Sequence, residues 1–90
     1  MANTSKKRET FTYQQPGAST VSLAGDFTEW DKNPIQLKKQ KDGTWKTAVS
    51  LAPGTYEYRF LVDGEWRNDS ECTRFRTNPF GAENCVRIVN

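Results

Sequence analysis

The 90-residue chain contains no histidine and only two cysteines, Cys72 and Cys85. Without histidine it has no Ser-His triad and no imidazole to act as a general base. The cysteines do not form a C-x-x-C motif and no histidine could complete a zinc ligand set, so we expect neither a metal site nor a cofactor. One disulfide is arithmetically possible, but the cytoplasmic location expected below disfavours it.

Long apolar runs are also missing from the sequence. No segment approaches the roughly 20 residues that span a membrane, and no apolar segment follows Lys6, Lys7 and Arg8 as it would in a secretory signal. We therefore expect a cytoplasmic protein that does not bind membranes. Residues 1–10 are expected to form a flexible basic tail and residues 11–90 a single domain.

Apolar residues make up only 34% of the chain and charged residues 27%, a composition that by itself leans towards disorder. Three Trp, three Tyr and five Phe argue against disorder, because disordered segments contain few aromatic residues. A small number of large side chains can fill the thin core between two sheets. We therefore expect a folded domain with a modest core.

Turn dipeptides divide the sequence clearly. Asp42-Gly43 and Asp63-Gly64 are strong hairpin signals, and Pro16-Gly17 and Pro53-Gly54 mark further turns. Between the turns, apolar and polar side chains alternate with a period of two, and no stretch has helical periodicity. The predicted strands cover residues 8–13, 19–25, 35–39, 44–51, 55–62, 65–67 and 83–89.

Short strands separated by frequent turn signals predict an all-β sandwich. The core face of 55–62 is expected to carry the alternate residues Tyr56, Tyr58, Phe60 and Val62. Trp45 shares its face with Val49 and Leu51, which predicts that it is a core residue. Residues 68–81 lack alternation and are predicted to form a long loop, a kind of segment that is often functional.

Trp30 and Trp66 each end a strand-like run among polar residues, whereas a core tryptophan normally lies within an apolar alternation. Flat apolar rings at loop edges suit the face of a sugar. One contact of about 100 Å² contributes about 2–3 kcal/mol, so two rings with hydrogen bonds imply micromolar-to-millimolar binding. Two angled rings would follow a curved α-glucan, and coplanar rings a flatter β-glucan. The alternative is that these rings cap the edge of the sandwich.

The segments V-S-L-A-G-D-F-T-E-W and Y-E-Y-R-F-L-V-D-G-E-W resemble the family-48 carbohydrate-binding module. That family includes the glycogen-binding domain of the AMP-activated kinase beta subunit and the N-terminal domains of isoamylase and branching enzymes. The resemblance covers roughly residues 20–89 and implies an early-set, immunoglobulin-like β-sandwich of about seven antiparallel strands. It further implies non-catalytic binding of α-1,4-glucan such as glycogen or starch, and targeting or regulation of a glycogen-metabolising enzyme.

The resemblance also implies five carbohydrate-binding residues, namely Trp30, Arg59, Trp66, Phe80 and Asn84. The tryptophans would stack on glucose rings with the basic residue between them, the asparagine would bind hydroxyls, and the phenylalanine would prop the sugar. Ala82 stands where glycogen-binding relatives often carry threonine, which removes a hydroxyl contact and leaves fine specificity open. From the residues alone, Arg59 could instead be a surface arginine paired with Glu57 or Glu65.

Two other classes of function fit the same fold. The first is a protein-interaction or regulatory module without a working sugar site. The second is a single-strand nucleic-acid binder that combines aromatic and basic residues, the latter being Lys38, Lys39, Lys41, Arg59, Arg67, Arg74 and Arg76. Acids are interspersed among these residues and the net charge is only +2, so we expect no nucleic-acid partner.

An enzymatic function is not expected. A glycosidase needs two carboxylates about 5–10 Å apart across a cleft. The candidate carboxylates all lie at turns or strand ends, where solvated acids are normal; they are Asp26, Glu29, Asp31, Asp63, Glu65 and Asp69.

Overall fold

The computed structural model describes residues 6–90, and nearly all of its regular structure is β-strand. The strands are β1 (Lys7–Gln14), β2 (Val21–Gly25), β3 (Ile35–Gln36), β4 (Lys38–Lys39), β5 (Thr44–Leu51), β6 (Gly54–Val62), β7 (Glu65–Arg67), β8 (Phe75–Thr77) and β9 (Glu83–Val89). Two short 3₁₀ helices, η1 (Asp26–Thr28) and η2 (Trp30–Lys32), follow β2. Within this range no helix has the length and apolar character needed to cross a membrane.

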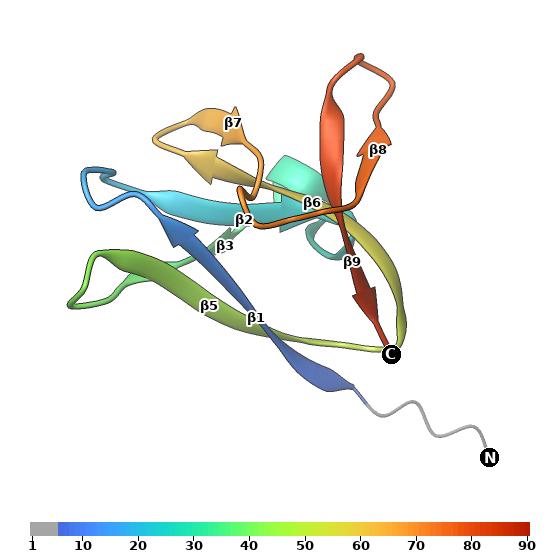
Figure 1. The fold of residues 1–90 in the computed structure, drawn as a ribbon, viewed down its shortest axis with the longest axis horizontal. Helices are drawn as coiled ribbons and strands as arrows, with labels where there is room; N and C mark the ends of the chain where they lie inside the picture. Colours follow the sequence, from blue (N-terminus) through green and yellow to red (C-terminus); the bar gives the residue numbers. More distant parts are fainter. Residues whose placement is uncertain (1–5) are drawn as a thin grey trace.

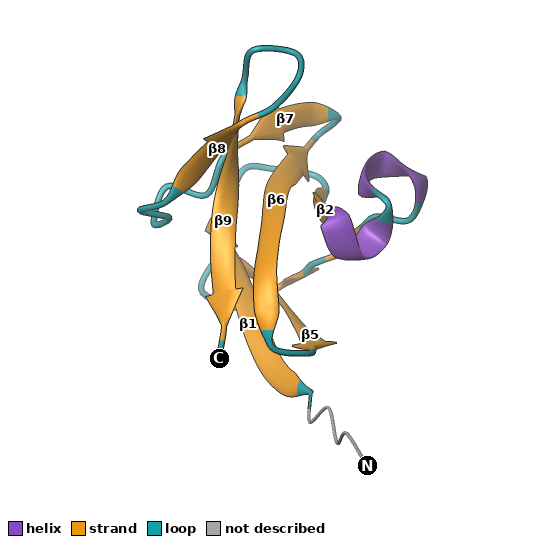
Figure 2. Cartoon of the chain, turned by 90° about the vertical axis from the view of Figure 1, so that its right-hand side faces the viewer, coloured by secondary structure: helices purple, strands orange, loops and turns teal. Residues whose placement is uncertain are grey.

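The strands form two antiparallel sheets that pack face to face (Figure 1). The smaller sheet has the order β1-β5-β4, and the larger has the order β3-β2-β6-β9-β8, with β7 paired to β6. Figure 2 shows β6, β9 and β8 side by side, with the 3₁₀ helices beyond β2. The predicted all-β sandwich is therefore confirmed.

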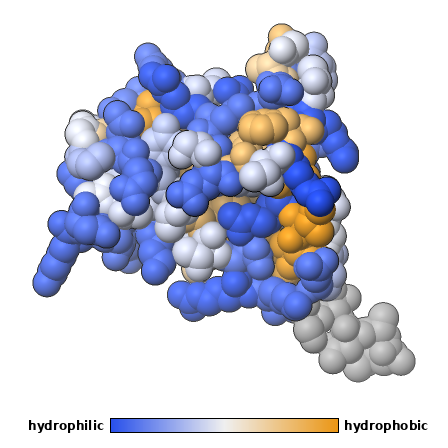
Figure 3. All heavy atoms as spheres, viewed as in Figure 1, coloured by the Kyte–Doolittle hydropathy of each residue, from blue (hydrophilic) through white to orange (hydrophobic). Residues whose placement is uncertain are grey.

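The core between the sheets follows the predicted alternation. Along β6, Tyr58, Phe60 and Val62 are buried, and Tyr56 packs against the same cluster. Trp45 is also buried, and its indole Nε1–H donates to the carbonyl of Gln15 at 2.9 Å. The outer surface in Figure 3 is mostly hydrophilic, with an apolar area along the side where β9 lies.

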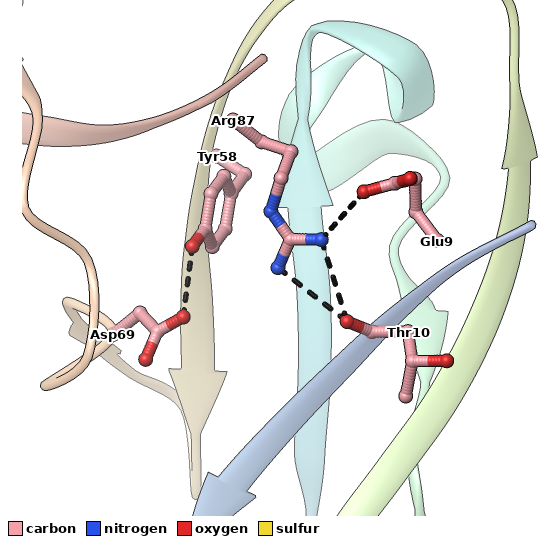
Figure 4. Close-up of polar contacts among 5 residues, drawn as sticks. All are labelled: Glu9, Thr10, Tyr58, Asp69 and Arg87. Carbon is pink, nitrogen blue, oxygen red and sulfur yellow. Dashed lines mark hydrogen bonds and ion pairs between the residues drawn. The ribbon is translucent and has the colours of Figure 1, made fainter. Parts of the chain in front are cut away.

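A polar cluster joins β1 to β9 at one side of the core (Figure 4). Arg87 donates to Glu9 at 2.8 Å, and its guanidinium carbon lies 4.1 Å from the centre of the Phe11 ring. The hydroxyl of Tyr58 donates to Asp69 at 2.8 Å. Burial raises the pKa of Tyr58, so the phenol stays neutral and keeps this donor. The cluster thus ties both sheets, and the chain after β7, to one another.

The start of the domain differs from the expected boundary. The expected tail, 1–10, overlaps the strand predicted at 8–13, and the structure has β1 there, with Lys7 paired to Leu51. Residues 7–10 show little alternation because β1 is an edge strand whose first residues are exposed. Residues 1–5 of the expected tail lie outside the described residues.

Two predicted segments are subdivided in the structure. The predicted strand 35–39 is divided at buried Leu37 into β3, which pairs with β2, and β4, which pairs with β5, so the chain changes sheets there. The predicted loop 68–81 contains β8, which pairs with β9. All three residues of β8 are exposed, so the sequence carries no alternation to reveal it.

Cys72 and Cys85 form a disulfide, contrary to the sequence expectation. Cys85 lies fully buried in β9, and their Cα atoms are 6.0 Å apart. Asp69 holds the chain after β7 against Tyr58, and this brings Cys72 back over β9. The path of the chain, which cysteine spacing does not reveal, therefore brings the two residues together.

Candidate functional site

A groove of about 780 Å³ is lined by residues from β6, β7, β8 and β9, from the turn between β8 and β9, and from the two 3₁₀ helices. All five residues implied by the resemblance line it, although they come from distant parts of the chain. The groove also includes the side chains of Asp26, Asp31, Glu57 and Asn78, which the sequence analysis did not assign to a site. Within residues 6–90 no group of three or more His, Cys, Asp or Glu residues could hold a metal ion.

Two tryptophans form an angled pair in this groove. The ring centres of Trp30 and Trp66 are 6.4 Å apart, and their planes are inclined by 68°. Trp66 is 39% exposed and Trp30 is half-buried. Both rings are therefore accessible at least in part, and their relative angle is a feature that the sequence could not provide.

The turn that carries Trp30 is tightly constrained. A side chain at Gly25 would place its Cβ 2.5 Å from the carbonyl oxygen of Glu57, so β2 and β6 need glycine here. Glu29 and Trp30 have φ angles of 53° and 57°, a left-handed conformation that is unusual for such large residues. The buried hydroxyl of Thr28 stabilises this turn: it accepts from the Gly25 N–H at 2.9 Å and lies 2.9 Å from the Trp30 carbonyl oxygen, to which it can donate.

Replacing Thr28 with valine keeps the shape of the side chain but removes the hydroxyl. The buried Gly25 N–H then loses its partner, and we expect the free energy of unfolding to fall by about 1–3 kcal/mol. Urea denaturation would measure the change. Thr12→Val, at an exposed position of β1, is the matched control and is expected to change stability by less than about 0.5 kcal/mol. Equal stability of the two variants would contradict the role of Thr28.

Arg59 lies beside the tryptophan pair. Its Nε–H donates to Oδ1 of Asn68 at 2.7 Å, and its guanidinium carbon lies 5.8 Å from the centre of the Trp66 ring. The two acids considered as partners are paired elsewhere, Glu57 with Arg76 and Glu65 with Arg67. Across residues 6–90 Arg59 forms no ion pair, so its charge remains available to the groove.

Asn84 borders the groove but is only 4% exposed. Its Nδ2 donates to Oε1 of Glu57 at 3.0 Å, and its Oδ1 accepts from Nδ2 of Asn78 at 3.2 Å. Each end of the amide therefore makes one hydrogen bond to a protein group and keeps capacity for another, so the role of Asn84 as a sugar ligand stays a prediction. In this structure Asn84 fixes the two polar side chains beside it.

Phe80 is held at the tip of the turn between β8 and β9, where it is 94% exposed. The side-chain oxygen of Asn78 accepts from the N–H groups of Phe80 and Ala82 at 3.0 and 3.1 Å. Gly81 supplies the positive φ, 86°, that the turn requires. The Asn-Pro dipeptide at 78–79 is a turn signal that could have indicated this structure from the sequence.

Comparison with known proteins matches residues 8–90 to the family described as the glycogen recognition site of AMP-activated protein kinase. The phosphoglucan phosphatase DSP4 of Castanea sativa is 32% identical over 87 residues, which cover 94% of this chain and 23% of that protein. The AMP-activated protein kinase subunit beta of Schizosaccharomyces pombe is 44% identical over 50 residues, covering 56% of this chain and 16% of the subunit. The PTST homolog 2 of Arabidopsis thaliana is 40% identical over 52 residues, covering 58% and 10%.

The chain spans less than a quarter of the length of each of these relatives, so the similarity concerns one domain of each. The family match, by contrast, extends over both sheets and every residue of the groove. The chain therefore belongs to the glycogen-recognition family of carbohydrate-binding modules.

Proposed function

We propose that the groove binds α-1,4-linked glucan without catalysing a reaction. Trp30 and Trp66 stack on glucose rings, Arg59 donates hydrogen bonds to hydroxyls, and Phe80 supports the sugar chain from the opposite side. Asn84 acts chiefly by orienting Glu57 and Asn78. The observation that carries this proposal is the angled tryptophan pair.

The angle matters because α-1,4-linked glucose units rotate progressively along a curved chain. Two rings inclined by 68° can each meet the apolar face of a different glucose unit on such a curve. A flat β-1,4-glucan presents parallel faces and would fit coplanar rings better. The arrangement of Trp30 and Trp66 therefore supports an α-glucan as the ligand.

The proposed role in targeting an enzyme to glucan is based on the kinds of protein in which similar domains occur. Two of these proteins are a phosphoglucan phosphatase and a protein kinase subunit, and in each the matching region is a minor part of the protein. A module of this kind would hold an attached or associated catalytic unit close to glucan. We therefore propose that the domain localises or regulates a glucan-metabolising enzyme.

The alternatives are a protein-interaction module and a nucleic-acid binder. Binding of nucleic acid would differ from binding of glucan in the charge it requires and in its dependence on salt. Three carboxylates, those of Asp26, Asp31 and Glu57, line the groove, against the single guanidinium of Arg59. The net negative charge of the groove would therefore repel a polyanion such as a nucleic acid. The affinity for a polyanion would also fall steeply with salt. Binding of a neutral glucan should be nearly independent of salt.

Titration with maltoheptaose, followed by tryptophan fluorescence, tests the proposal directly. We expect a saturable change with a dissociation constant in the micromolar-to-millimolar range. The constant should differ by less than about twofold between low and high salt, since no ion pair forms. Cellohexaose, a β-linked control, should bind much more weakly. Absence of any change at about 10 mM maltoheptaose, well above this range, would contradict glucan binding.

A further inference from the structure

Glu57 lines the groove but is not among the five carbohydrate-binding residues implied by the resemblance. It lies on β6 two residues before Arg59, on the face opposite to the buried Tyr58. Its Oε1 accepts from Asn84 at 3.0 Å, and its Oε2 lies 3.5 Å from Nη1 of Arg76. Its backbone N–H donates to Asp26 at 2.9 Å. The carboxylate is therefore oriented by neighbours on β8 and β9, and the backbone of Glu57 is held by Asp26 on η1.

The carboxylate of Glu57 keeps unused acceptor capacity. Two carboxylate oxygens offer about four lone-pair positions, and Asn84 and Arg76 engage only part of these. The side chain is 22% exposed and lines the groove, so a sugar hydroxyl can reach it. Hydrogen bonds to an ionised acceptor are stronger than those between neutral groups.

The charge of Glu57 also bears on which glucans fit. A phosphate monoester carries about −1.5 to −2 charges at neutral pH. In the groove it would meet three carboxylates, those of Glu57, Asp31 and Asp26, against the single positive charge of Arg59. The guanidinium of Arg76 does not offset them fully, because it lies outside the groove lining and is 62% exposed to solvent.

We propose that Glu57 is a specificity-determining residue of the groove. It accepts hydrogen bonds from the hydroxyls of an uncharged glucan, and its charge excludes glucan segments that carry a phosphate monoester. Asn84 is the positioning residue that holds this carboxylate. The inference rests on the proposed glucan-binding function and adds the chemical class of glucan that the site selects.

The test compares maltopentaose with maltopentaose that carries one phosphate monoester on its central glucose. For the unmodified domain we expect the phosphorylated sugar to bind about five- to tenfold more weakly at low salt. High salt should reduce this difference, whereas it should leave the affinity for the neutral sugar unchanged. Equal or tighter binding of the phosphorylated sugar at low salt would overturn the inference.

Glu57→Gln keeps the size of the side chain and an oxygen that can accept from Asn84. We expect it to weaken maltopentaose binding by about three- to tenfold, through loss of a charge-assisted hydrogen bond, and to reduce the discrimination against phosphate. Glu65→Gln is the matched control, since Glu65 is also paired with an arginine but lies outside the groove lining. It should bind both sugars as the unmodified domain does. A Glu57→Gln variant with unchanged affinity and discrimination would overturn the inference.

The two proposals fail in different ways. If maltopentaose does not bind the unmodified domain at all, the proposed glucan-binding function is wrong. If maltopentaose binds but the phosphorylated form binds equally well, only the role of Glu57 is wrong. The salt comparison on the unmodified domain decides this even if Glu57→Gln fails to fold.

Discussion

Replacing Trp66 with alanine is expected to lower the affinity for maltoheptaose by about 30- to 150-fold while leaving the domain folded. The expected loss corresponds to about 2–3 kcal/mol, the transfer free energy of roughly 100 Å² of apolar contact. Trp66 also supports the position of Trp30, whose ring it meets at 68°, and lies near the guanidinium of Arg59. Isothermal titration calorimetry would measure the affinity, and circular dichroism would confirm the fold.

The exposed phenylalanine Phe75 provides a control for this prediction. It is 47% exposed on β8, in the same sheet, but does not line the groove. Phe75→Ala should therefore bind maltoheptaose like the unmodified domain. A folded Trp66→Ala variant that retains its affinity would refute the stacking role, and equal losses in both variants would indicate a general effect on the sheet.

The position of Trp66 could be predicted because it depends on local sequence. A tryptophan at the polar end of a strand, after an Asp-Gly turn, has no core to enter. The alternation of β6 was equally visible, since the strand is buried on one face only. The sandwich and the exposed ends of the strands that carry Trp30 and Trp66 could thus be predicted from the sequence, but the angle between the two rings could not.

The short strands show where local patterns fail. The sequence predicts one strand over β3 and β4, because each has only two residues and the chain changes sheets at a single buried residue, Leu37. β8 has no buried side chain, so its pairing with β9 leaves no periodic signal. In both cases the partner strand, and not the segment itself, determines the structure.

The polar network of the groove could not be predicted for a related reason. Asn84 and Glu57 are 27 residues apart in sequence, and their hydrogen bond depends on the pairing of β9 with β6. The resemblance identified Asn84 as a sugar ligand, but nothing in the sequence indicated that its amide would be buried. Thr28 was missed similarly, because its hydroxyl acts on a turn whose backbone conformation is unusual.

Loss of the Cys72–Cys85 disulfide is expected to lower the free energy of unfolding by about 3 kcal/mol, because the bond closes a short loop and limits the unfolded chain. In a domain of this size, such a change lowers the melting temperature by about 12–24 °C. The Cys72→Ala/Cys85→Ala variant would show it in thermal and urea denaturation. Treating the unmodified domain with dithiothreitol should produce a similar decrease, while leaving the double variant unchanged.

The same change should also affect the groove, because the disulfide holds the segment that contains Asn68 and Asp69. Asn68 accepts from Arg59, and Asp69 accepts from Tyr58, so release of this segment frees the arginine to adopt other rotamers. We expect maltoheptaose affinity to fall about two- to fivefold, less than for Trp66→Ala, because the stacking rings remain and one ordered side chain is lost. A variant that is less stable but binds normally would show that Arg59 is held by Asn68 without the disulfide. Unchanged stability would contradict the contribution of the bond itself.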